Sequence, residues 1–452
     1  MKRQIYNFNK RNFNYYFNKH KENSINTNLK IIKEFNVHNN PDLRLPKTES
    51  FQHHKSFYYD YNFSGKFLHQ TLACILNKNS IHLDDIIPEA KTLADYYSKN
   101  IKVGAYSDSN GVQMLRENII RLKEKEGEKN LFPKDFFFTN GSLNAYEQIL
   151  STICNENDQI MIPNPCYPFI SNITTSKSLN ILEYNLKEDS WEFDFENMER
   201  IFKANNDIYP IKAMVIINPH DPTGIVYSPK TIEKVINFCY EKKLSLISLE
   251  FSKNSILKKE KANEFQTTLK VLQNMPSPIS NKQVLFSVTG LTRGFPNLSS
   301  LRSGLVHTYN LDEFVHSQTL KYKSIDLCSS ILSQIAYDLV YGHDYREEFG
   351  KEFGDKYYQS IDHINKIVLD KKDSILKILK NNPKKLFNVQ DIDAGNNLFI
   401  KFNELSMTAF LNKYYEKFGK DILNPGNLYG FNRDNYVCLT VDPESDYDFL
   451  NI

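Results

Sequence analysis

The chain has 452 residues, with 56 Lys and Arg against 54 Asp and Glu, so its formal net charge at pH 7 is +2. A charge so close to zero argues against nucleic-acid binding, which needs a strongly basic surface. Hydrophobic residues make up 40% of the chain, but apolar runs such as 213–217 are far shorter than the roughly 18 residues of a membrane span. We therefore expect two linked subdomains and no transmembrane segment.

The first 21 residues differ from the rest of the chain. They contain six Lys and Arg and no acid before Glu22, with Phe and Tyr interleaved. Basic, acid-free N-termini are typical of organellar transit segments, so we predict a mitochondrial protein. The alternative is an Asn-rich leader without a targeting role, since Asn is a poor helix former. We interpret residues 1–50 as leader and N-terminal arm.

Further along, residues 51–100 are expected to form helices that belong to the arm and the small subdomain. In residues 101–325, short apolar runs alternate with longer amphipathic ones. This alternation predicts an α/β domain with a mostly parallel sheet between helices. The predicted strands are 135–139, 159–163, 179–184, 213–218, 244–249 and 284–288, and the predicted helices include 142–154 and 230–242.

Residues 326–452 are expected to hold connecting helices and a smaller α+β subdomain. Long helical patterns occupy 312–323, 329–341 and 356–379, and strand-like runs follow at 397–402 and 436–441. Six cysteines are scattered through the chain without a CxxC pair, so we expect neither a zinc site nor disulfides. They are Cys74, Cys154, Cys166, Cys239, Cys328 and Cys438.

Three loop motifs follow predicted strands, at the sheet edge where parallel sheets bind ligands. The run 139–142 reads TNGS and opens a helix, whose N-terminal N–H groups favour an anion. The run 163–168, PNPCYP, presents Tyr167, and 218–224 reads NPHDPTG. Each motif alone is a weak signal, because glycine and proline occur in many βα turns.

The order of the motifs is more informative. The series GAYSDSNG (104–111), TNGS, PNPCYP, NPHDPTG and Arg302-Ser303-Gly304 resembles alanine aminotransferases. These belong to the class I/II aminotransferases, which are pyridoxal-phosphate (PLP)-dependent enzymes of fold type I. The likeness runs from about residue 67 to about residue 440. It implies a large PLP-transferase domain with a mostly parallel sheet, and a smaller α+β subdomain.

The resemblance implies that the phosphate-binding residues are largely retained. Gly141 and Ser142 match the family's phosphate site at a helix N-terminus, and Arg302 matches the arginine that binds the same phosphate. Tyr167 matches the aromatic residue that covers the pyridine ring. Tyr106 matches the tyrosine that reaches the phosphate from the other subunit of a dimer.

The Schiff-base lysine of the family is replaced here. Arg293 stands at the matching position, and no lysine lies between Lys282 and Lys321. An arginine cannot replace that lysine, because its pKa of at least about 12 keeps it charged and a poor nucleophile.

Other residues of the family's reactive site are also changed. Leu249 stands in place of the aspartate that holds the proton on the ring nitrogen, and Ser252 in place of a tyrosine. Asp221 stands for an asparagine near the ring oxygen, and Cys438 for the arginine that binds the substrate carboxylate. Glu250 follows Leu249 and should therefore point to the opposite face of the strand.

These replacements predict a pseudoenzyme without catalytic residues or metal. We expect an accessory subunit of a mitochondrial assembly, a respiratory-chain complex or a mitochondrial ribosome, with other protein subunits as partners and a possible homodimer. We expect no cofactor, or PLP bound only non-covalently. One alternative is a pseudoenzyme that binds PLP or another phosphorylated ligand. The other is an active alanine transaminase that uses a relocated lysine, for which Lys253 is the nearest candidate.

Overall fold

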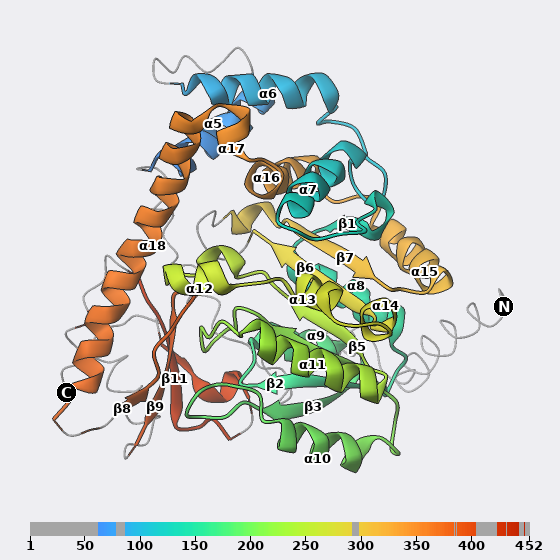
Figure 1. The fold of residues 1–452 in the computed structure, drawn as a ribbon, viewed down its shortest axis with the longest axis vertical. Coiled ribbons are helices and arrows are strands. Elements are labelled where there is room, and N and C mark those ends of the chain that lie inside the picture. The colour runs from blue at the N-terminus through green and yellow to red at the C-terminus, as the bar shows by residue number, and fades with distance from the viewer. Residues whose placement is uncertain are drawn as a thin grey trace, which may run out of the picture.

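A seven-stranded sheet forms the centre of the large domain (Figure 1). The structure is a computed structural model that describes residues 62–77, 86–291, 298–383, 385, 387–403, 423–430, 432–442 and 447. The strands lie in the order β1-β7-β6-β5-β4-β2-β3. Their bounds are β1 Phe136–Thr139, β2 Gln159–Asn164, β3 Asn180–Asn185, β4 Ile211–Ile217, β5 Ser245–Leu249, β6 Leu285–Gly290 and β7 Gly304–Tyr309.

One strand runs against the others. Strands β2 to β6 pair in parallel, whereas β7 lies antiparallel between β1 and β6. Gly304, the first residue of β7, is therefore opposite both Thr139 and Gly290, the last residues of their strands. The segment that enters β7 thus lies at the sheet edge where the parallel strands end and where such sheets bind ligands.

Helices cover both faces of this sheet, because alternate residues of each strand point to opposite faces. Ile247 and Leu249 of β5 pack in the cluster that includes α8 and α9, whereas Leu246 packs in the cluster of the other face. The helices of the first face are α8 (Ser142–Ile153) and α9 (Pro168–Ser176). Those of the second are α7 (Gln113–Lys125), α11 (Pro229–Lys242), α13 (Thr268–Asn274) and α16 (Ile331–Tyr341).

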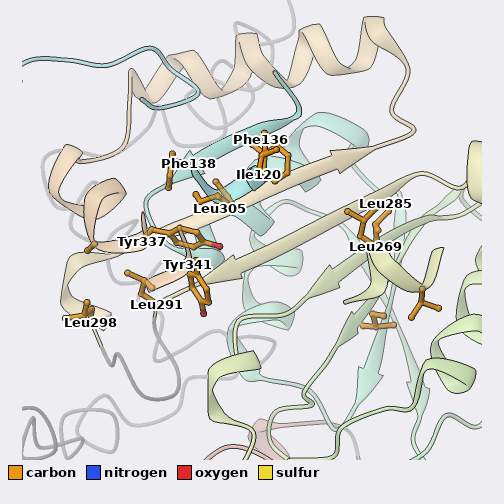
Figure 2. Packing of buried hydrophobic residues seen from close by; sticks show 14 of the residues in the cluster. Ile120, Phe136, Phe138, Leu269, Leu285, Leu291, Leu298, Leu305, Tyr337 and Tyr341 are labelled. Carbon is orange, nitrogen blue, oxygen red and sulfur yellow. The ribbon is translucent and has the colours of Figure 1, made fainter. Parts of the chain in front are cut away.

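Figure 2 shows part of the core on the second face. Phe138 of β1 and Leu305 of β7 lie near Tyr337 of α16, whose ring centroid is 4.7 Å from that of Tyr341. Further helices of the large domain are α10 (Phe195–Asn205), α12 (Lys259–Glu264), α14 (Ile279–Lys282) and α15 (Glu313–Lys323). Short 3-10 turns are Pro133–Asp135, Lys253–Ser255, Ser299–Leu301 and Ser324–Asp326.

The small subdomain is an antiparallel sheet in the order β10-β11-β9-β8, with one long helix against it (Figure 1). Ile375 and Leu379 of α18 (Lys351–Lys380) pack in one cluster with Val437 and Leu439 of β11. The strands are β8 Phe387–Val389, β9 Asn397–Phe402, β10 Leu423–Pro425 and β11 Tyr436–Thr440, and a 3-10 turn spans Gly426–Leu428.

The helices α5 (Phe63–Leu76) and α6 (Pro88–Asn100) pack against elements near the start of α18, which lie much later in the sequence. Phe67 of α5 is fully buried and makes edge contacts with Tyr345 of α17 (Tyr345–Glu348) and Phe353 of α18, at centroid distances of 5.1 and 5.2 Å. The hydroxyl of Tyr97, in α6, donates to Asp338 at 2.7 Å. These contacts tie residues 62–100 to the helices that connect the two subdomains.

The predicted fold class is confirmed: a mostly parallel α/β large domain accompanies an α+β subdomain. Each predicted strand and helix exists, with ends shifted by a few residues. Strand β7 was not predicted, because His307 and Thr308 interrupt its apolar pattern although both are buried. Strands β8 and β10 were also not predicted. Residues 1–50 lie outside the described residues. None of the six cysteines forms a disulfide, and no described helix is long and apolar enough to cross a membrane.

Candidate functional site

Gly141, Ser142 and Arg302 come together at the sheet edge, as predicted. Gly141 precedes α8 with φ of 92°, and a Cβ built on it would lie 3.5 Å from the Cζ atom of Arg302. The backbones approach closely at this point, since a Cβ on Gly304 would lie 2.6 Å from the carbonyl carbon of Gly141. The segment that enters antiparallel β7 therefore brings the Arg302 guanidinium to the start of α8.

This arrangement suits an anion. The N-terminus of α8 presents backbone N–H groups and the positive end of the helix dipole. Arg302 is exposed and makes no ion pair within the described residues. Its guanidinium can therefore donate two parallel hydrogen bonds to a phosphate. An open groove of about 600 Å³ lies beside it, and Asn140, Asn144, Ser330 and Ser333 contribute to its wall.

Tyr167 packs against the apolar cluster on the α8 face of the sheet. It precedes α9, is half-buried, and its ring centroid is 6.0 Å from that of Phe251 at an interplanar angle of 55°. It packs against the cluster that contains Leu249 and Cys166. Tyr167 and Leu249 are therefore on the same face of the sheet, consistent with the ring position that the resemblance assigns to Tyr167.

Leu249 and Glu250 point to opposite faces, as the strand periodicity predicted. Leu249 is 1% exposed and packs in the apolar cluster of the α8 face. Glu250 accepts a hydrogen bond of 2.7 Å from the backbone N–H of Thr268, at the start of α13, and another from the Ser248 hydroxyl. Burial raises the pKa of the Glu250 carboxyl. Glu250 therefore does not replace the missing carboxylate beside Tyr167.

Asp221 and Ser252 line a small cavity between the two subdomains. Its volume is about 20 Å³, enough for one water molecule. The carboxylate of Asp221 accepts a hydrogen bond of 3.0 Å from the side-chain amide of Asn397, which belongs to β9 of the small subdomain. The side chains that replace the family's asparagine and tyrosine thus meet at the subdomain boundary.

His220 also lines this cavity, and sequence reasoning did not single it out. Its Nδ1 is 2.8 Å from the Thr223 hydroxyl. Burial lowers the pKa of His220 to about 3, against a smaller opposing contribution from the backbone at Pro165. The imidazole is therefore neutral at physiological pH. Its position inside the NPHDPTG run, beside Asp221, was the available signal.

Three other predicted site residues do not lie beside Gly141, Tyr167 or Arg302 in the described part of one chain. Cys438 is fully buried in β11, in the core cluster with Phe399 and Tyr436, which agrees with an apolar filler. Tyr106 is 82% exposed. Arg293 lies in 292–297, outside the described residues.

Lys253, the candidate for a relocated lysine, faces away from Tyr167. Its Nζ lies 4.5 Å above the ring of Tyr341 in α16, on the second face of the sheet. Burial lowers the pKa of this amine. The amine is separated from Leu249 by the sheet itself, so its position does not favour a catalytic role beside Tyr167.

The comparisons agree with this geometry. The family described as "Aminotransferase class I and II" matches residues 75–250. The chain is 29% identical over 283 residues to human alanine aminotransferase 1, covering 61% of this chain and 57% of the relative. Over this region the chain is similar to class I and II aminotransferases. Its match spans little more than half the length of these curated relatives.

Another similar protein is named an inactive alanine aminotransferase, from Saccharomyces cerevisiae. It is 27% identical over 244 residues, covering 53% of this chain and 48% of the relative. Solved structures share the fold: an alanine aminotransferase from Pyrococcus furiosus has a TM-score of 0.63 at 19% identity, covering 85% of this chain and 94% of its own. A tyrosine aminotransferase from Leishmania infantum has a TM-score of 0.65 at 16% identity, covering 91% and 89%.

The prediction that a cofactor is unlikely is wrong. The family and its solved neighbours are PLP-dependent aminotransferases, and PLP binding is their norm. The residues of this chain fit PLP at its phosphate, where Arg302 lies over Gly141. At the ring, Tyr167 can stack, and Leu249 supplies an apolar contact instead of a carboxylate.

Proposed function

We propose that this chain is a catalytically inactive member of the class I and II aminotransferase family that still binds PLP by its phosphate group. One observation carries the proposal: the exposed guanidinium of Arg302 lies over Gly141 at the start of α8, while the apolar Leu249 is buried in the cluster against which Tyr167 packs. The phosphate-binding residues are thus assembled, and the residues of the reaction are not.

The chemistry follows from these side chains. Bound PLP would supply an electron-accepting ring, which requires a proton on its nitrogen. Leu249 has no group that could hold that proton. The guanidinium of Arg293 stays charged at neutral pH and neither attacks a carbonyl nor accepts a proton. Arg302 and the N–H groups of α8 would neutralise the phosphate, and Tyr167 would cover the ring.

Equilibrium dialysis with PLP tests the binding. We expect saturable binding that Arg302→Ala weakens by about tenfold to a hundredfold, because a hydrogen bond to a charged group is worth about 1.5–3 kcal/mol. Arg346→Ala is the matched control, since Arg346 is an exposed arginine paired with Asp355 on the connecting helices. Absence of saturable binding at millimolar PLP would contradict the proposal.

An alanine:2-oxoglutarate assay with added PLP tests the inactivity. We expect no turnover above the blank. Turnover that persists through purification and is abolished by Lys253→Ala would show that the relocated lysine works, and the chain would then be an active transaminase.

A second candidate function is that of an accessory subunit in a mitochondrial assembly. The basic, acid-free run 1–21 motivates the location. Large apolar side chains support a protein contact, because Tyr106, Ile325 and Leu327 are 82%, 72% and 55% exposed. A homodimer, in which Tyr106 would reach the other subunit's phosphate site, is one such contact.

Fractionation of gently solubilised mitochondria on native gels, followed by mass spectrometry, separates these arrangements. Comigration with a large complex supports the accessory subunit. Migration as a dimer of twice 52.9 kDa favours the PLP-binding pseudoenzyme, and absence from mitochondria removes the argument from the leader.

A further inference from the structure

One buried arginine of the small subdomain contacts the large domain. Arg433 precedes β11 and is 4% exposed. Its Nε donates to Oδ1 of Asn164 at 3.0 Å, and one terminal nitrogen donates to the backbone carbonyl of the same residue at 3.2 Å. The other terminal nitrogen donates to Glu188 at 2.7 Å. All three acceptors belong to the large domain, so these three hydrogen bonds cross the boundary.

Aromatic rings enclose the same guanidinium. Its Cζ lies 5.6 Å from the ring centroid of Trp191, in the large domain, and 5.1 Å from that of Tyr436, in β11. The Trp191 ring also contacts Phe399 of β9 at 5.8 Å. We call Arg433, Asn164, Glu188, Trp191 and Tyr436 the Arg433 cluster.

The cluster lies against the loop that carries Tyr167. Asn164 is the last residue of β2. Two residues later, the backbone N–H of Cys166 donates to the carbonyl of Tyr429 at 2.6 Å. A Cβ on Gly430 would lie 2.2 Å from the Asn164 side chain, so the two subdomains are in tight contact here. Movement of the small subdomain must therefore break these contacts.

A second contact between the subdomains lies at the cavity beside Asp221. The backbone N–H of Ala394 donates to the Gly224 carbonyl at 2.9 Å, and that of Gly395 donates to the Ser255 carbonyl at 2.7 Å. Lys372 of α18 also contacts this segment, because its amine donates to the Gly395 carbonyl at 2.6 Å. With both contacts formed, the cavity beside Asp221 holds only about 20 Å³.

We propose that Arg433 is a positioning residue that keeps the small subdomain closed over the candidate site. A ligand larger than water then reaches the cavity beside Asp221 only after the small subdomain has moved away. The side chain acts through the boundary and touches no ligand. The closed position does not depend on PLP, so this inference goes beyond the proposed function and is tested separately from it.

The chain contains its own reporter for this test. Trp191 is the only tryptophan, and it is buried in the cluster. Acrylamide quenching of its fluorescence measures how often the boundary opens. In Arg433→Gln, Oδ1 of Asn164 and the Glu188 carboxylate each lose a charged hydrogen bond of the closed state, and water replaces it when the subdomain moves away. We expect the ratio of open to closed molecules to rise at least about tenfold, because each charged hydrogen bond lost is worth about one such factor.

Graded variants separate positioning from general loosening. Arg433→Lys keeps the charge opposite Glu188 but cannot span both acceptors of Asn164, so its quenching should be intermediate. Arg346→Gln is the matched control: Arg346 also pairs with an acid and lies over a tyrosine ring, but it is half exposed on α17. We expect its quenching to equal that of the unchanged chain.

Hydrogen exchange provides the second readout. Circular dichroism first confirms that each variant is folded, and Arg433→Lys decides the matter if Arg433→Gln does not fold. Faster exchange in 164–168 and 426–430 should accompany the increased quenching. The inference is overturned if folded Arg433 variants show unchanged quenching and exchange, or if Arg346→Gln shows the same increase. Failure of PLP to bind would refute the proposed function and leave these readouts unaffected.

Discussion

Replacing Leu249 by aspartate tests whether the family's ring-nitrogen carboxylate can be restored in this chain. The side chain is 1% exposed among apolar residues that include Phe251 and Ile217. Loss of the leucine contacts costs about 2–5 kcal/mol. A carboxylate without a partner adds a desolvation cost of several kcal/mol unless it takes up a proton. We expect Leu249→Asp to lower the free energy of unfolding at pH 7 by about 5 kcal/mol.

Urea denaturation followed by circular dichroism measures this effect, and Leu249→Asn is the control of equal shape without charge. Burial raises the pKa of a carboxyl, so the folded aspartate variant holds a proton that its unfolded form releases. Its instability should therefore shrink as the pH falls toward 5. Added PLP should stabilise Leu249→Asp more than Leu249→Asn, because a ring nitrogen proton would give the carboxylate a partner. The reasoning is refuted if both variants unfold at the same urea concentration at pH 7, or if PLP acts on both equally.

Three further predictions concern groups outside the ring position. Burial would lower the pKa of His343, but hydrogen bonds to Asp338 and a second acid outweigh it and raise this pKa to about 9. The stabilisation by protonated His343 is complete below the unfolded pKa of 6.5 and is lost as the pH rises through 9. His343→Gln should therefore lower the free energy of unfolding, measured by urea titration, by about 3 kcal/mol in acid and by much less in alkali. Burial lowers the pKa of Lys372 to about 7, so the folded chain loses stability as the pH falls from 10.5 to 7, and Lys372→Met should flatten the melting temperature across that range. Gly304→Ala would place a methyl 2.6 Å from Gly141; we expect about 2 kcal/mol of destabilisation and weaker PLP binding by dialysis, and unchanged values for both would contradict the close approach.

Much of the large domain was predictable from periodicity. Strand β4, for example, is buried on both faces, and its residues 213–217 form an uninterrupted apolar run. Strand β7 was not recognised, because His307 is polar in sequence but lies 4.0 Å from the Phe136 ring, stacked inside the core. The antiparallel direction of β7 could not be inferred from local pattern either, since direction depends on pairing with distant strands.

The candidate site divides in the same way. Gly141, Ser142 and Arg302 follow from motifs that each belong to one loop, and the structure brings them together. The hydrogen bond between Asp221 and Asn397 joins residues far apart in the chain, so no local sequence pattern predicts it. The same is true of the Arg433 cluster, of whose members only Asn164 belongs to a motif. A single sequence indicates which loops reach a sheet edge, but not which side chains of another subdomain will cover them.

The contact of Phe67 with Tyr345 has a consequence for synthesis of the chain on the ribosome. The two rings are 5.1 Å apart, yet about 280 residues separate them in the sequence, which at the usual elongation rates takes roughly 15 to 60 seconds to translate. During that time the apolar face of α5 has none of its partners from α17 and α18. A nascent chain released early therefore exposes this face, and we expect chaperones to bind fragments that end before α17 more strongly than the complete protein.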